Sequence, residues 1–265
     1  MTVFALVLAG VFGLVIGSFL NVVIYRVPRE LSLVTPASRC PSCETPIKAR
    51  HNVPVLGWLV LRGHCAQCQA PISARYPLVE AATSVLFIAV TVRFGLTIEL
   101  PAYLYLTAIA VALALIDFDV QRLPDSIVLP SYVVGVLLLM PAGAVEGNWW
   151  SAVRGLLAMS ILFGVYLALA MAYPGGLGFG DVKLAGLLGL YLGWVSWGSV
   201  LWATFGAFLL GGGVGLGLIA ARRARGKGAI PFGPFMLAGA FLALFFASQV
   251  STLYGDLLRA TSPST

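Results

Sequence analysis

The sequence predicts an all-α polytopic membrane protein with about eight transmembrane helices and one small zinc-ribbon-like loop. Of its 265 residues, 60% are hydrophobic and only 10% are charged, whereas about a quarter of the residues of a soluble domain are charged. Apolar runs long enough to cross a bilayer recur along the chain. One polar segment, which holds all four cysteines, interrupts them near the start.

The first apolar run, near 3–25, has no basic region before it and no small-residue cleavage site after it. We therefore expect a retained span and not a cleaved signal peptide. Since a span needs about 20 apolar residues, or fewer in the middle of a bundle, seven more are expected near 77–98, 101–118, 127–144, 151–172, 183–197, 199–220 and 232–253.

The boundary between the sixth and seventh spans is the least defined. The segment from Gly193 to Gly198 could form a tight turn or the middle of one broken helix, and charge parity favours the turn. Glycines at 211–213, 215 and 217 resemble a small-residue face that lets helices approach closely. No period of 20–50 residues is expected to repeat, so a solenoid or an inverted-repeat transporter has no support.

Three regions follow from this pattern: a first span over 1–25, a loop over 26–76 and a seven-helix catalytic domain over 77–265. The loop is too short to build its own hydrophobic core. We therefore expect something other than a core to hold it together.

The formal net charge of +6 is distributed as in a membrane protein and not as in a nucleic-acid-binding protein. Seven basic residues lie in the loop (Arg26, Arg29, Arg39, Lys48, Arg50, Arg62 and Arg75), and four more lie together (Arg222, Arg223, Arg225 and Lys227). Basic residues concentrate on the cytoplasmic side of membrane proteins. The loop is therefore predicted to be cytoplasmic and both termini to face outward, with contact to anionic lipid or to a substrate leader as an addition.

The cysteines form two C-x-x-C pairs, Cys40/Cys43 and Cys65/Cys68, with 21 residues between them. This spacing is close to that of a four-cysteine zinc ribbon, and four thiolates leave no open position for a catalytic water. We expect structural zinc, which would supply folding energy to the loop. Disulfides would not suit a reducing cytosol, and a redox dithiol would need a thioredoxin-like unit. His64 could replace a ligand, but neither His51 nor His64 is included in the site.

Asp117 and Asp181 are the leading candidates for catalysis. Asp117 ends an apolar run, and Asp181 closes Gly178-Phe179-Gly180-Asp181. Carboxylates at membrane depth are costly and usually functional. Two of them predict a water activated by acid/base chemistry. The alternative is that the two acids pair with Arg122 and Lys183 at helix ends.

Five motifs in order resemble the bacterial type IV prepilin peptidases, which are membrane aspartic proteases. They are the segment from Gly17 to Pro28, the two C-x-x-C pairs, the segment from Tyr76 to Glu80, the segment from Asp117 to Pro130, and the segment from Gly178 to Lys183. The resemblance covers nearly the whole chain.

The resemblance implies that Asp117 and Asp181 are the catalytic pair. It selects Asp117 over Asp119, because Pro124 follows Asp117 by seven residues; Asp125 is expected to cap the helix after Pro124. It also implies a multi-pass protein of the bacterial inner membrane, with its active site toward the cytoplasm. The implied substrates are type IV prepilins or type II secretion pseudopilins, whose basic leader is removed.

Members of this family with a cysteine-containing loop are also described as methylating the new N-terminus from S-adenosylmethionine. The resemblance thus implies a second, methyltransferase activity, although no motif here predicts a donor site independently. Weak candidates for that site are Asn21, Arg26 and Glu80. The oligomeric state does not follow from the sequence.

Three other functions remain open on the residues alone. An ion-coupled transporter would also bury carboxylates but would depend on ion gradients. A presenilin-like protease shares the glycine-x-glycine-aspartate pattern, yet Ala229 to Pro234 stands where a proline-alanine-leucine element would be expected. A non-catalytic scaffold would keep its function without either aspartate.

Overall fold

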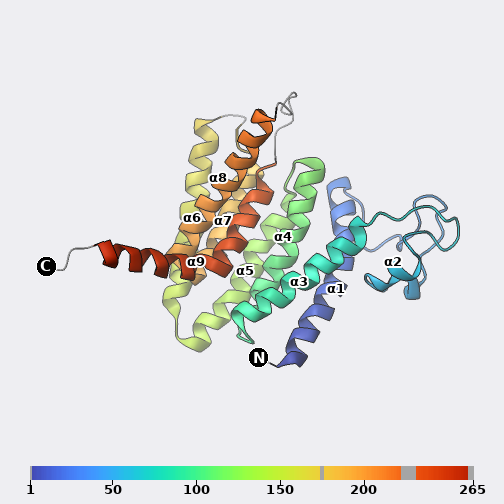
Figure 1. The fold of residues 1–265 in the computed structure, drawn as a ribbon, viewed down its shortest axis with the longest axis horizontal. Helices are drawn as coiled ribbons and strands as arrows, with labels where there is room; N and C mark the ends of the chain where they lie inside the picture. Colours follow the sequence, from blue (N-terminus) through green and yellow to red (C-terminus); the bar gives the residue numbers. More distant parts are fainter. Residues whose placement is uncertain (1, 174–175, 222–230, 262–265) are drawn as a thin grey trace. The chain divides into compact units, whose positions relative to one another are not determined.

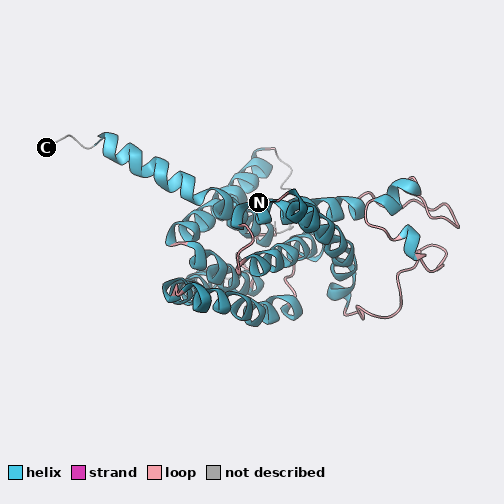
Figure 2. Cartoon of the chain, turned by 90° about the horizontal axis from the view of Figure 1, so that it is seen from below, coloured by secondary structure: helices cyan, strands magenta, loops and turns pink. Residues whose placement is uncertain are grey.

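The computed structural model describes residues 2–173, 176–221 and 231–261, with side chains in the last range described as far as Ala247. Figure 2 shows helices and loops in this part of the chain, and the only β-pairing within it is two isolated bridges. The helices are α1 (Val3–Arg26), η1 (Val27–Arg29), η2 (Ala49–His51), α2 (Leu56–Val60), α3 (Arg75–Phe94), α4 (Leu100–Val120), α5 (Asp125–Glu146), α6 (Trp149–Ala172), α7 (Phe179–Val195), α8 (Trp197–Ala220) and α9 (Gly233–Thr261).

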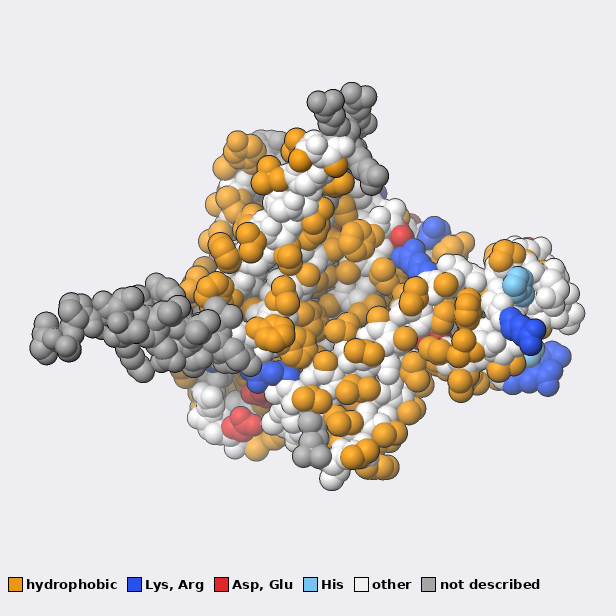
Figure 3. Space-filling view, in the orientation of Figure 1, with side chains coloured by type: hydrophobic (Ala, Val, Ile, Leu, Met, Phe, Trp, Pro, Cys, Tyr) orange, Lys and Arg blue, Asp and Glu red, His pale blue; other side chains and the backbone are white. Residues whose placement is uncertain are grey.

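The predicted all-helical membrane fold is confirmed. Six helices are long and apolar enough to cross a membrane: α1, α3, α4, α5, α6 and α8. The two other predicted spans correspond to α7, which has 17 residues, and α9, whose apolar part covers Gly233–Ala247. Figure 3 shows hydrophobic side chains spread over the visible face of the helices, as expected for a surface that meets lipid.

The turn predicted between the sixth and seventh spans is also confirmed. Ser196 adopts an extended conformation between the end of α7 and the start of α8. Its side chain accepts a hydrogen bond from the backbone N–H of Ser199, which caps the new helix. The predicted cytoplasmic cluster from Arg222 to Lys227 lies outside the described residues.

The chain divides into two compact units, Met1–Ile116 and Asp117–Thr265. The first holds α1, α3 and the cysteine loop, and the second holds α5 to α9 (Figure 1). The sequence-based division at residues 25 and 76 separates membrane from loop instead of one compact unit from another. It stays a prediction.

In the first unit, α1 and α3 approach closely through the glycines of α1. A Cβ atom added to Gly13 would lie 2.6 Å from the Cα of Ser84, and one added to Gly17 would lie 2.7 Å from the Cα of Glu80. The Ser84 hydroxyl donates to the Gly10 carbonyl at 2.8 Å. Small residues that allow such approach are typical of helix packing in membranes.

In the second unit, α7 is packed on nearly all sides. Its residues from Leu184 to Trp194 are all buried. A Cβ added to Gly189 would lie 2.5 Å from the Ala158 carbonyl oxygen, so α6 and α7 are in backbone contact there. Arg154 of α6 donates to the carbonyls of Gly193, Trp194 and Val195 and holds the C-terminal end of α7.

The packing face predicted for the glycines of α8 is wrong at most of its positions. Cβ atoms added to Gly212, Gly213, Gly215 or Gly217 would meet no described atom within 4 Å. Only Gly211 has a close neighbour, since an added Cβ would lie 3.1 Å from the Phe232 ring. Close glycine contacts between helices occur instead on α1 and α7, and also on α9, where a Cβ added to Gly239 would lie 2.6 Å from the Ala203 carbonyl oxygen of α8.

Candidate active site and cysteine cluster

Asp117 lies near the C-terminal end of α4 and is 5% exposed. Its Oδ2 atom is buried and has no hydrogen-bond partner among the described residues. A Cβ added to Gly233, the first residue of α9, would lie 2.7 Å from this oxygen. The lack of a side chain at Gly233 therefore leaves room for the carboxylate. Since buried polar atoms are usually satisfied, an unsatisfied one marks a functional candidate.

Asp181 lies in the first turn of α7 and is 9% exposed. Its Oδ2 accepts a hydrogen bond from the backbone N–H of Gly178 at 3.1 Å. A carboxylate in the first turn satisfies a free N–H and is favoured by the helix dipole. The same local contact fixes the direction of the Asp181 side chain. The sequence has a glycine-rich segment before Asp181, and residues 174–175 of that segment lie outside the described part of the chain.

Leu123 connects the surroundings of the two acids. A Cβ added to Gly180, next to Asp181, would lie 3.0 Å from the Cβ of Leu123. A Cβ added to Gly233, next to the Asp117 carboxylate, would lie 3.5 Å from the Cδ1 of Leu123. The end of α4, the start of α7 and the start of α9 thus meet around one leucine side chain, as a two-aspartate site requires.

The neighbouring charged residues have other roles. Lys183 Nζ lies 2.7 Å from both carboxylate oxygens of Asp125, so the alternative in which Lys183 pairs with Asp181 is wrong. The predicted capping by Asp125 is also wrong, because Pro124 takes the cap position and Asp125 is the first helical residue. Asp119, the competing candidate, is exposed on the last turn of α4.

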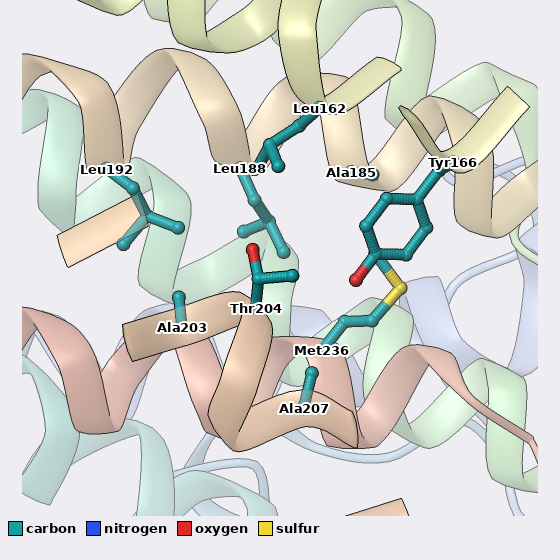
Figure 4. A pocket seen from close by; sticks show the side chains of 9 residues that line it. All are labelled: Leu162, Tyr166, Ala185, Leu188, Leu192, Ala203, Thr204, Ala207 and Met236. Atoms are coloured by element: carbon teal, nitrogen blue, oxygen red, sulfur yellow. The ribbon is translucent and has the colours of Figure 1, made fainter. Parts of the chain in front are cut away.

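A small apolar cavity lies between α6, α7, α8 and α9, and its nearest approach along α7 is one turn beyond Asp181, at Ala185. Figure 4 shows Tyr166, Thr204 and Met236 directed into it. Its full lining comprises Leu162, Tyr166, Ala185, Leu188, Leu192, Ala203, Thr204, Ala207 and Met236. It is a packing gap within the helices and offers no carboxylate or metal ligand.

The four cysteines converge as predicted. Their sulfur atoms all lie within 4.8 Å of one another. Cys40 Sγ lies 3.8 Å from Cys68 Sγ, and Cys43 Sγ lies 4.0 Å from Cys65 Sγ. Four sulfurs placed tetrahedrally at about 2.3 Å from zinc would be separated by about 3.8 Å. The cluster therefore fits a tetrahedral ion, whereas a disulfide would need a separation of about 2.05 Å.

The two cysteine pairs have the same backbone arrangement, 25 residues apart. The N–H of Cys40 donates to the carbonyl of Thr45, and the N–H of Cys65 donates to that of Ala70. Isolated bridges join Arg39 to Pro46 and His64 to Pro71. The segments 39–47 (RCPSCETPI) and 64–72 (HCAQCQAPI) match in sequence as well. The expectation that no such period repeats is therefore wrong for this loop.

Local hydrogen bonds favour the thiolate form of Cys43. The side chain and backbone of Thr45 hydrogen-bond to Cys43 and lower the pKa of this thiol to about 6. The thiolate, which is the form that binds metal, is therefore available at neutral pH. His64 is not drawn into the cluster, since its Nδ1 lies 2.7 Å from the Arg62 carbonyl oxygen.

Comparison with known proteins gives one match for the part of the chain with the cysteine loop and another for the part with the two aspartates. Residues 11–94 match the bacterial peptidase A24 N-terminal domain, and residues 104–255 match the type IV leader peptidase family. The chain belongs to the type IV leader peptidase family. The first match contains the cysteine loop, and the second contains both aspartates.

Relatives of this family align over nearly the whole chain. The prepilin leader peptidase/N-methyltransferase of Stutzerimonas stutzeri is 36% identical over 94% of this chain and 93% of the relative. Proteins of the same name from Aeromonas hydrophila and Pseudomonas aeruginosa are 38% and 33% identical, over 92% and 91% of this chain and 91% and 90% of the relatives. No solved structure matches.

The three weak candidates for a methyl-donor site in this family member all bond to backbone groups. Asn21 donates to the Tyr76 carbonyl at 3.2 Å, Arg26 donates to two carbonyls of the loop, and Glu80 accepts from the Val55 N–H at 2.7 Å. These contacts join the loop to α1 and α3. They give no independent support for donor binding, which stays a prediction at these residues.

Gly233 is the site residue that sequence reasoning missed. The segment from Pro231 to Pro234 carried a signal, because a glycine between prolines and before an apolar run is unusual at a helix start. What the sequence did not contain was the contact partner, which is 116 residues away along the chain at Asp117.

Proposed function

We propose that this chain removes the short basic leader of type IV prepilins or type II secretion pseudopilins, with Asp117 and Asp181 as its catalytic pair. One observation carries the proposal: two buried carboxylates from distant segments each lie next to a glycine that packs against Leu123, and one of the carboxylates has a buried oxygen without a partner among the described residues. The names of the relatives supply the substrate class.

The chemistry follows from two carboxylates that share a site. Both do not ionise cheaply together, so the pair holds one proton. The ionised partner accepts a proton from a water as that water attacks the scissile carbonyl, and the protonated partner donates to the carbonyl oxygen. The two titrate as a coupled pair, so neither role is assigned to one residue.

The two glycines allow close packing at the site. Gly180 presents no side chain where it faces Leu123, and Gly233 presents none toward Asp117, so the segments that carry the two carboxylates can approach one another. By family, the leader is cut at the cytoplasmic face of the inner membrane. The charge distribution of the sequence supports that orientation, with thirteen basic residues predicted inside and three outside.

The four cysteines are proposed to hold structural zinc. Their sulfurs lie within 4.8 Å of one another, and two of the separations, 3.8 Å and 4.0 Å, are close to those of a tetrahedral site. Zinc bound by four thiolates contributes folding energy and not catalysis. The ligands are Cys40, Cys43, Cys65 and Cys68.

Methylation of the new N-terminus is the second proposed activity. Its support is the printed name of the relatives, which includes N-methyltransferase. S-adenosylmethionine would supply the methyl group, and no step is assigned to particular residues of this chain.

Cleavage of a purified prepilin in detergent by the wild type, Asp117→Asn and Asp181→Asn tests the catalytic pair. We expect each substitution to reduce cleavage by about 1,000-fold or more, because neither amide can exchange the proton. Asp119→Asn is the matched control on the same helix and should cleave at the wild-type rate. Retained cleavage in either Asp117→Asn or Asp181→Asn would reject that residue as catalytic.

A pilin supplied without its leader tests methylation separately. With S-adenosylmethionine present, mass spectrometry should show a gain of one methyl group at its N-terminus, both with the wild type and with Asp181→Asn. No gain with the folded, zinc-loaded wild type would reject the second activity and leave the first intact.

A further inference from the structure

The extramembrane loop contains a short helix, α2 (Leu56–Val60), whose apolar side chains point outward. Leu56, Leu59 and Val60 are 59%, 55% and 77% exposed. They lie at positions i, i+3 and i+4 and therefore share one face of the helix. An exposed apolar face on an extramembrane element marks an interaction surface.

The opposite side of α2 is used for packing. Gly57 is buried and lies in contact with the His51 carbonyl. Trp58 donates from Nε1 to the Ile72 carbonyl at 3.0 Å, and its ring packs on Gly63. Trp58 packs beside the second cysteine pair, at Gly63 and Ile72, and Leu56, Leu59 and Val60 lie on the other side of the helix.

The residue before α2 is hydrogen-bonded to α3. Glu80 accepts a hydrogen bond from the N–H of Val55, directly before α2, at 2.7 Å. Glu80 is five residues inside α3, and its Cα is the atom nearest to a Cβ added to Gly17. Gly17 is nine residues before the end of α1, which is about 13 Å along the helix axis. The start of α2 is thus held beside the first turns of α3.

The hydrogen bond to Glu80 holds Val55 in an unfavourable backbone conformation. Val55 has φ of 59°, a left-handed conformation that is costly for a β-branched residue. The Glu80 carboxylate is 8% exposed and bonds the N–H of this same residue. Glu80 therefore fixes where α2 starts and which way its faces point.

Charge around α2 matches a phospholipid surface. Lys48 and Arg50 precede it, Arg62 follows its last residue by two positions, and all three are exposed. Between residues 26 and 76 the chain has seven basic and two acidic residues. Figure 3 shows Lys and Arg side chains gathered at this part of the first unit. Apolar face and basic flanks together are the pattern of an interfacial helix.

We propose that α2 is an interfacial anchor, with Leu56, Leu59 and Val60 inserted among the acyl chains of the bilayer and the flanking basic residues at the anionic headgroups. On α3, two residues before Glu80, Leu78 is also 66% exposed. Glu80 is a positioning residue for this anchor. The anchor holds the cysteine loop against the membrane from which α1 and α3 emerge.

Site-specific photo-crosslinking tests the anchor in the full, zinc-loaded chain. Benzoylphenylalanine is placed at Leu59, or at Ala66 as the matched control, and the protein is reconstituted in nanodiscs of phosphatidylcholine and phosphatidylglycerol. Ala66 is also exposed in the loop, at the second knuckle. After illumination, mass spectrometry of the loop peptide should show phospholipid adducts at least tenfold more abundant for position 59 than for position 66.

The other outcomes overturn the proposal. Equal lipid adducts at both positions would mean that the loop touches lipid without a dedicated anchor. A protein adduct at position 59 would identify a protein partner instead, and no adduct there would place α2 in water. The Asp181→Asn variant should give the same adducts as the wild type, so the test does not depend on peptidase activity.

Discussion

The close contact between Gly233 and Asp117 means that the position of the Asp117 carboxylate depends on a single glycine. Replacement by alanine would put a Cβ 2.7 Å from Oδ2 of Asp117, and the easiest relief is rotation of the Asp117 side chain. Displacement of a catalytic group by about 1 Å can cost about 100-fold in rate. We therefore expect Gly233→Ala to lower kcat for prepilin cleavage by about 100-fold while the protein stays folded.

Gly212→Ala is the matched control for that substitution. An added Cβ there meets no described atom within 4 Å, so the cleavage rate should not change. If Gly233→Ala cleaves at the wild-type rate, the Asp117 carboxylate is not confined as described.

At the scale of single elements, the contact between α6 and α7 depends on Gly189. A Cβ at this position would lie 2.5 Å from the Ala158 carbonyl oxygen, which is backbone and has little freedom to move. Overpacking of this kind usually costs about 1–3 kcal/mol. Gly189→Ala should therefore lower the midpoint of thermal unfolding in detergent.

Gly164→Ala on α6 provides the comparison. An added Cβ there has no neighbour within 4 Å, and alanine is favoured over glycine in a helix by about 1 kcal/mol. This variant should unfold at the wild-type temperature or above it. A lower midpoint for Gly164→Ala than for Gly189→Ala would contradict the packing described.

The cysteine loop is the element that should respond to metal. One zinc per chain is expected by elemental analysis, and Cys43→Ser should abolish stoichiometric binding. Because the ion supplies folding energy to the loop, its removal by a chelator should speed trypsin cleavage at Arg50 and Arg62 by about tenfold or more. Asp181→Asn should retain zinc and protease resistance, and wild-type resistance that survives complete zinc removal would argue against a structural metal.

For the whole molecule, the sequence predicts that the loop over 26–76 is cytoplasmic and that both termini face outward. Alkaline phosphatase fused after Thr265 should be active, and green fluorescent protein at that position should be dark. Fusions inserted in the loop after Thr35 should show the reverse. Phosphatase activity in the loop would invert the orientation and move the proposed active site to the other side.

The helices of this chain could be predicted from sequence because hydropathy reports length and polarity directly. Their contacts could not, because hydropathy does not identify the neighbour of a residue. Gly212, Gly213, Gly215 and Gly217 on α8 resemble packing glycines in sequence, although an added Cβ there meets no described atom within 4 Å, whereas Gly189 on α7 lies against the backbone of α6. The Asp125–Lys183 ion pair joins residues 58 positions apart and left no local pattern.

In the candidate site, too, some residues could be predicted from the sequence and others could not. Asp117, Asp181 and the four cysteines are chemically unusual in a membrane protein, so composition and spacing made them candidates. The family resemblance was needed to choose Asp117 over Asp119. Gly233 and Leu123 are ordinary residues that matter through their position. The repeat in the cysteine loop was not predicted because each copy covers only nine residues, 39–47 and 64–72.

Because α7 is enclosed by other helices, it should tolerate different substitutions from α8. Nearly all of α7 touches other helices, whereas much of α8 is exposed within the described part of the chain. A substitution on the exposed side of α8 is tolerated when the new side chain is apolar enough for lipid. A substitution on α7 is tolerated only when the new side chain is small enough to fit. Among descendants of this chain, α7 should therefore keep its small residues, while α8 exchanges one bulky apolar residue for another.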